Sequence, residues 1–133
     1  MRPRNVLVIS VGLCFLAVGV PVAGAASQLP TAARRDARLE KEMVAIMTAL
    51  WKQDKVLKAI IVEKGWSNET AQVRGRPVVV ARRITAKIVS KVQSGRCRLF
   101  DIVFRQAKSG GGFGRTEYHS VGDSEDIPCE NVK

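Results

Sequence analysis

The sequence has only one histidine, His119, and aromatic residues make up 5% of its 133 residues. A single imidazole cannot build a His-rich metal site. A Ser-His-Asp arrangement would have to pair His119 with Ser120 or Ser124. Neighbouring residues on a strand point to opposite faces, so His119 and Ser120 would not meet. These absences argue against the commonest hydrolytic and metal-dependent chemistries.

Acidic side chains that would serve an active site are also scarce. In the predicted sheet the carboxylates are Asp101 and Glu117, and an enzyme with a site in the sheet pocket would need His119, Asp101 or Glu117 to face inward together. The acidic cluster at 123–126 lacks the ligand spacing of a Ca²⁺ loop. We therefore predict no catalytic residues, no metal site and no cofactor, and a chain that is not an enzyme.

The glycine-rich segment 109–114 does not follow the pattern of a phosphate-binding loop. Such a loop needs a helix directly after its last glycine, and the P-loop form needs Lys followed by Ser or Thr. Here Arg115 and Thr116 follow, and the next element has a strand pattern. We predict a mobile hairpin tip, with Phe113 and Arg115 as candidate contact residues.

Residues 1–25 have the three-part layout of a secretory signal peptide, with two arginines ahead of an apolar run at 6–22. The run has 17 residues, fewer than the ~20 that a membrane-spanning helix needs. We predict cleavage near Ala25 and a secreted or periplasmic mature protein without a transmembrane span. An uncleaved anchor is the alternative. Lipid attachment at Cys14 is disfavoured because Leu13, which is not small, precedes it.

Export explains the two remaining cysteines, Cys97 and Cys129, because such a pair is oxidised outside the cytoplasm. A bridge between them closes a ring of 33 residues. We predict that this disulfide holds a C-terminal tail that has little apolar surface of its own. Pairing between two chains is the alternative.

Basic residues outnumber acidic ones, with 22 Lys and Arg against 12 Asp and Glu. The predicted signal removes two basic residues and no acidic ones, which leaves a net charge of +8. Such a chain favours an anionic surface or an acidic protein partner. Nucleic acid is not predicted, because the basic hairpin has no aromatic side chain on its polar face for base stacking. The candidate contacts in that hairpin are Arg83, Lys87, Lys91 and Arg98.

The mature chain begins with a polar segment, 26–35, that has no periodicity and is predicted to be a flexible leader. Apolar residues then recur at helical spacing from Leu39 to Trp51, which predicts an amphipathic helix over 36–52. Asp36 is its expected N-cap. β-Branched residues up to Glu63 predict a strand that starts near Leu57, although residues 55–59 equally allow a longer helix. Turn-forming residues follow at 66–70 and 73–77.

The strongest strand pattern runs from Val78 to Val92, where even positions are mostly apolar and odd positions mostly polar. The length predicts a bent strand with Arg82 near a bulge or at the rim. A three-residue loop, Gln93-Ser94-Gly95, pairs the apolar face with that of the next strand, and Gly95 takes the left-handed position. The predicted pairs are Ile88 with Phe100, Ala86 with Ile102, Ile84 with Phe104 and, on the other face, Lys87 with Asp101.

The rest of the chain is predicted to form a short strand at 116–121, an acidic turn at 122–126 and a tail that contains Cys129. The expected architecture is therefore a single α+β domain over 36–133. It has one N-terminal amphipathic helix packed on a bent antiparallel sheet of about four strands, with one disulfide.

The segment Ala71-Gln72-Val73-Arg74-Gly75 resembles the Gln-x-Val-x-Gly loop with which cystatins enter the clefts of cysteine proteases, and it matches at Val73 and Gly75. The predicted element order is also similar to the cystatin-like and NTF2-like plan, in which the sheet wraps the helix. Ala71 stands where the family has Gln, and the Pro-Trp of the second cystatin loop is absent. Our first hypothesis is a small basic binding protein of unknown ligand; the resemblance implies a cystatin-like protease inhibitor as the alternative.

Overall fold

A computed structural model of the chain describes residues 28–132. The predicted signal peptide, its cleavage position and Cys14 lie outside these residues. Within residues 28–132, no helix has the length and apolar character that crossing a membrane requires.

The predicted helix is confirmed as α1 (Ala37–Leu50). Asp36 caps it, because its Oδ1 accepts a hydrogen bond from the Leu39 N–H while Glu40 Oε2 accepts one from the Asp36 N–H. α1 lies well inside the chain rather than at its N-terminus. Leu50, which the periodicity places on the buried face, is 54% exposed, because the helix ends there and leaves the sheet.

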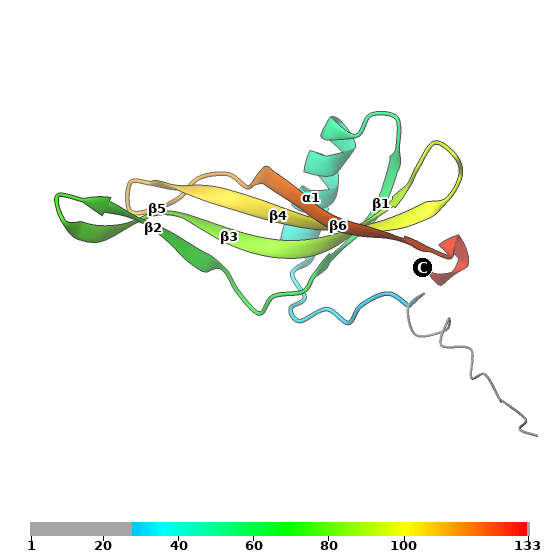
Figure 1. Ribbon diagram of the computed structural model, residues 1–133, viewed down its shortest axis with the longest axis horizontal. Coiled ribbons are helices and arrows are strands. Elements are labelled where there is room, and N and C mark those ends of the chain that lie inside the picture. The colour runs from blue at the N-terminus through cyan, green and yellow to red at the C-terminus, as the bar shows by residue number, and fades with distance from the viewer. Residues whose placement is uncertain (1–27, 133) are drawn as a thin grey trace, which may run out of the picture.

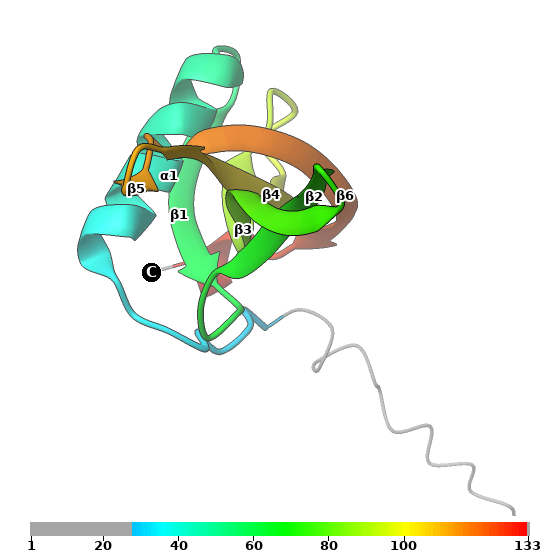
Figure 2. The same ribbon diagram turned by 90° about the vertical axis from the view of Figure 1, so that its left-hand side faces the viewer.

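The sheet has six strands rather than about four. β1 and β2 both pair with the same edge of β3, while β5 and β6 pair with β4. All pairs are antiparallel, and the sheet curls (Figures 1 and 2). The strands are β1 (Lys55–Ile61), β2 (Ser67–Val73), β3 (Arg76–Lys91), β4 (Cys97–Ser109), β5 (Gly112–Phe113) and β6 (Glu117–Ile127), and a short 3₁₀ helix, η2 (Cys129–Asn131), follows.

The register of β3 and β4 is the predicted one. Ile88 pairs with Phe100 and Lys87 with Asp101, and these last two side chains form an ion pair. The Val92 N–H donates to the Arg96 carbonyl around a three-residue loop, in which Gly95 has φ 86°. A backbone φ of this size is disfavoured for residues with a Cβ, so glycine is the residue that suits this loop position.

Three segments differ from the sequence-based expectation. β1 begins at Lys55, which excludes a longer helix. The segment 66–70, expected to be a turn, belongs largely to β2 because its backbone pairs with β3. The expected acidic turn at 122–126 is part of β6, which continues to Ile127 along β4. Two register shifts between β4 and β6 accommodate the additional β6 residues.

The bend expected near Arg82 is produced two residues earlier. Glu69 pairs with Ala81 and Thr70 with Val79, so Val80 is the extra residue of a β-bulge in β3. The turn that joins β2 to β3 has Arg74 at φ 52° and Gly75 at φ 77°. Positive φ at both central residues matches the twist of a two-residue hairpin.

The face of the sheet that carries Ile102 and Phe104 is filled by α1. Both side chains are fully buried, and they share one cluster with Met43 and Met47 of the helix. The sheet and helix therefore enclose a packed core at this position, which directs attention to the ends and the surface of the molecule.

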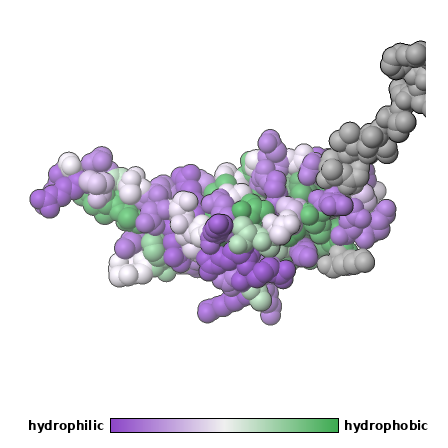
Figure 3. All heavy atoms as spheres, turned by 90° about the horizontal axis from the view of Figure 1, so that it is seen from below, coloured by the Kyte–Doolittle hydropathy of each residue, from purple (hydrophilic) through white to green (hydrophobic). Residues whose placement is uncertain are grey.

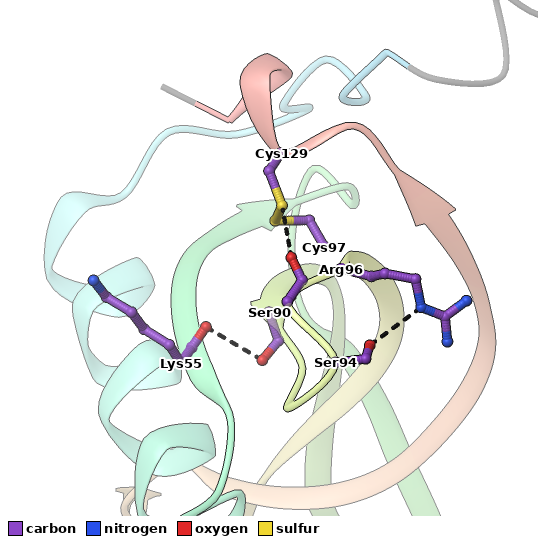
Figure 4. Close-up of a disulfide and its surroundings, with 7 residues drawn as sticks. Lys55, Ser90, Ser94, Arg96, Cys97 and Cys129 are labelled. Atoms are coloured by element: carbon purple, nitrogen blue, oxygen red, sulfur yellow. Dashed lines mark hydrogen bonds between the residues drawn. A yellow bond between two sulfur atoms is a disulfide. The ribbon is translucent and has the colours of Figure 1, made fainter.

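A second hydrophobic cluster lies on the other face of the sheet, where segments from both ends of the described chain meet. Val89 and Leu99 of the sheet contact Leu29 and the C-terminal segment. The predicted disulfide joins Cys97 to Cys129 here, with a Cα–Cα distance of 5.2 Å (Figure 4). The Ala33 N–H also donates to the Ile61 carbonyl. The segment predicted to be a leader thus packs on the domain from Leu29 onwards.

Candidate functional site

One hairpin, which we call the arm, projects beyond the part of the sheet that α1 covers (Figure 1). It consists of β2 and the first residues of β3, up to Ala81. Every residue from Ala71 to Val78 is exposed, and Val73 and Val78 are 48% and 43% exposed. Seen from below, the arm has hydrophobic side chains among hydrophilic ones and a hydrophilic tip (Figure 3).

Charge is concentrated at this end of the molecule. The arm and its neighbours at 67–83 and 105–115, here called the cationic end, hold seven basic residues and one acidic residue, Glu69. Residues 116–132 hold five acidic residues and no Lys or Arg; the first of them, Glu117, lies beside the cationic end, where it forms an ion pair with Arg115. The described chain is therefore electrically polarised, and a net positive field at one end attracts anions over about one Debye length.

Glu69 holds part of the cationic end together. Its Oε2 accepts hydrogen bonds from the Nε–H groups of Arg83 and Arg105, both at 3.0 Å, so it links β2, β3 and β4. These two hydrogen bonds, more than the attraction between the charges, lower the pKa of Glu69 from its ordinary 4.5 to about 2. One carboxylate thus serves two guanidinium groups, and the trio keeps a net positive charge.

The Glu69→Gln variant should be less stable than the wild type at neutral pH, and the difference should vanish on acidification. Glu69 is ionised in both states above pH 4.5, where its stabilising effect is complete, and that effect is lost as the pH falls towards about 2. Urea unfolding of both proteins across this pH range measures the difference. An Arg83→Gln/Arg105→Gln background should remove the pH dependence; a pH-independent difference in the wild-type background would contradict the linkage.

The four basic residues singled out from the sequence lie in different surroundings. Arg83 belongs to the Glu69 trio, Lys87 forms an ion pair with Asp101, and Arg98 forms one with Asp126. Lys91 is exposed at the end of β3 and forms no ion pair within residues 28–132. Only Arg83 of this set lies at the cationic end.

The four candidate loop residues all lie at or beside the cationic end. Val73 and Gly75 are at the tip of the arm. Phe113 is in β5, which forms a short hairpin with the end of β4, and Arg115 follows it. Gly110 at the turn of that hairpin has φ 59°. The glycine-rich segment is therefore a hairpin tip, as predicted.

Asp101, Glu117 and His119, which an active site in the sheet would combine, do not interact with one another. Asp101 pairs with Lys87, and Glu117 is exposed with its carboxylate on Arg115. His119 is exposed on β6 at a register shift. In the part of the chain that the structure describes, no three His, Cys, Asp or Glu side chains are grouped as metal ligands.

Sequence reasoning missed a pocket at the base of the cationic end, beside the start of α1. It has a volume of about 430 Å³. Arg82 lines it, together with Trp66 and Gln106. The available signal was Arg82 itself, a charged residue on the apolar face of β3, and the predicted register already placed Gln106 opposite it.

Comparison with protein families, with curated proteins and with solved structures finds no match to this chain.

Proposed function

We propose that this chain is a small exported binding protein that recognises an anionic partner with its cationic end. The observation that carries the proposal is the excess of seven basic residues over one acidic residue at 67–83 and 105–115. Arg74 and Arg76 stand at the exposed tip of the arm, and neither forms an ion pair within residues 28–132. They are available to an external anion, whereas Lys87 and Arg98 are neutralised within the protein.

Two features support the proposed compartment. The N-terminal 25 residues have the layout of a cleavable signal, with the cut placed near Ala25, and the domain contains a disulfide, which persists in an oxidising environment. Both support a secreted or periplasmic protein. A polyanionic surface or an acidic protein is then a more suitable partner than nucleic acid, and the arm has no aromatic residue for base stacking.

The arm is tested with an Arg74→Gln/Arg76→Gln variant and vesicles that contain an anionic phospholipid as the probe. Each basic residue near such a surface contributes about 1 kcal/mol, so the variant should bind roughly tenfold or more weakly. Vesicle sedimentation at low and high salt measures the binding, which should weaken at high salt for the wild type.

The matched control is Lys52→Gln/Lys64→Gln, which removes the same charge from two exposed lysines outside the cationic end. The two variants have equal net charge, so a difference between them reports position. Equal binding of both variants, or wild-type binding that salt does not change, would reject the cationic end as the binding surface.

The alternative is a cystatin-like protease inhibitor. The observation that favours it is the position of Val73 and Gly75 at the tip of a projecting hairpin, the kind of element that can enter a cleft. Inhibition of papain by the purified protein, lost in a Val73→Asp variant, would support this function. Full papain activity at a large molar excess of the protein would exclude it for this class of protease.

A further inference from the structure

Arg82 is held in an unusual setting at the base of the cationic end. Its guanidinium carbon lies 4.5 Å from the ring centroid of Trp66 and 4.2 Å from that of Phe113. Trp66 directly precedes β2 and Phe113 is in β5, so the rings approach from opposite flanks of the β3–β4 pair. Two aromatic contacts favour the cationic group and restrict its orientation.

A chain of hydrogen bonds fixes Arg82 further. Its Nε–H donates to Gln106 Oε1 at 2.7 Å, and the Gln106 Nε2–H donates to the hydroxyl of Thr116 at 2.9 Å. The Thr116 N–H in turn donates to Glu42 of α1. Thr116 is 5% exposed, so this network is internal and connects the sheet to the helix.

The two terminal nitrogens of Arg82 are left without a partner. Within residues 28–132, neither makes a hydrogen bond or an ion pair, and the side chain is half-buried. Neither nitrogen is among the buried atoms that lack a partner, so both remain in contact with solvent and can donate to a bound ligand. Because Nε already binds Gln106, the fork of terminal N–H groups remains for a ligand.

The charge around Arg82 favours an anion in the pocket. Four arginines and two acidic residues line it; Arg34 and Arg115 are themselves in ion pairs, so Arg38 and Arg82 are the two lining arginines without an ion pair within residues 28–132. Asp36 binds Arg34 and caps α1, and Glu42 accepts from the Thr116 N–H. The four arginines are Arg34, Arg38, Arg82 and Arg115.

We propose that this pocket binds a small organic carboxylate, whose two oxygens accept hydrogen bonds from the terminal nitrogens of Arg82. A planar carboxylate matches the guanidinium fork. A singly charged carboxylate also tolerates Asp36 and Glu42 in the wall better than a doubly charged phosphate does. Leu39 and Trp66 provide apolar wall for the body of the ligand, and about 430 Å³ is within the size range of small-molecule sites. The site goes beyond the proposed function: it lies at the base of the cationic end and takes a small molecule, whereas the partner surface is tested at Arg74 and Arg76 at the tip of the arm.

The test uses benzoate as the probe, with its uncharged amide, benzamide, as the matched compound. The chain has two tryptophans, and only Trp66 lines the pocket, while Trp51 packs on Phe100. In a ¹⁵N-labelled sample, benzoate should shift the indole N–H signal of Trp66 saturably and leave that of Trp51 in place. A Trp51→Phe variant assigns the two signals. Benzamide should leave both signals unchanged.

Arg82→Gln should weaken benzoate binding about 10–100-fold, because it removes hydrogen bonds to a charged group. Arg82→Lys should also bind more weakly, since an ammonium lacks the planar fork. Arg35→Gln is the charge-matched control: Arg35 is exposed and does not line the pocket, so affinity should stay within about twofold. The Trp51 signal reports whether each variant is folded.

The outcomes separate this site from the arm. Arg74→Gln/Arg76→Gln should leave benzoate binding unchanged, whatever it does to vesicle binding. The carboxylate assignment is overturned if benzamide binds as well as benzoate, or if inorganic phosphate displaces benzoate at lower concentration. It is also overturned if folded Arg82→Lys retains wild-type affinity, a comparison that stands even where Arg82→Gln does not fold.

Discussion

Phe104→Ala is expected to lower the free energy of unfolding by about 3–5 kcal/mol. Phe104 is fully buried and is the largest such side chain, and it lies between the sheet and the methionines of α1. Removing the ring leaves a cavity that a close-packed helix and sheet cannot fill without moving. Urea unfolding followed by circular dichroism measures the loss.

Tyr118→Ala is the matched control for this substitution. Tyr118 pairs with Phe104 across β4 and β6 but is 36% exposed, so truncating its ring should cost much less, about 1 kcal/mol or less. Equal losses for the two variants would mean that α1 does not pack on this face of the sheet in solution.

Removal of the disulfide in a Cys97→Ala/Cys129→Ala variant is expected to destabilise the protein by about 3–4 kcal/mol. The bridge spans 32 positions in sequence and anchors η2 to the second hydrophobic cluster. Alanine is the suitable replacement because Cys97 is 1% exposed among apolar side chains, where a serine hydroxyl would have no partner. Chemical denaturation and hydrogen exchange measure the effect.

The residues that lose amide protection should show that the bridge anchors the C-terminal segment. Amide protection should fall most around Ile127 and η2, while α1 and the centre of β3 keep theirs until global unfolding. Reduced wild-type protein should behave as the double variant does. A double variant within about 1 kcal/mol of the oxidised wild type would show that the tail docks without the bridge.

The sequence predicted the β3–β4 pair in detail because both strands alternate in the same way. Their apolar residues coincide in only one register, and Gly95 at positive φ fixes the loop length that permits it. α1 was predictable for a similar reason, since its apolar spacing and the Asp36 cap agree.

β2 was missed because it carries no hydrophobic alternation. Six of its seven residues are exposed, so its place in the sheet comes from backbone pairing with β3 and from the Glu69 contacts across three strands. The second half of β6 was missed for the same reason: Gly122 to Asp126 are all exposed. Strands stabilised on neither face by a core leave no periodic signal.

The pocket around Arg82 could not be predicted, because its prediction required the strands that the sequence reasoning had missed. Trp66 was placed in a turn, so nothing predicted that it would meet Arg82, and Phe113 was expected to be free at a hairpin tip. Pairing by the predicted register already joined Arg82 to Gln106, two polar residues on an apolar face. Such a polar pair on an otherwise apolar face is a sequence signal for a site, here one beside the start of α1.

The two ends of the described chain meet in one hydrophobic cluster, since Leu29 and Val132 both pack against it, and this bears on how a tethered protein would be oriented. The described chain begins and ends close to the disulfide, at the opposite end of the long axis from the tip of the arm (Figure 1). Tethering the protein through either end would therefore leave the arm pointing outward and unobstructed.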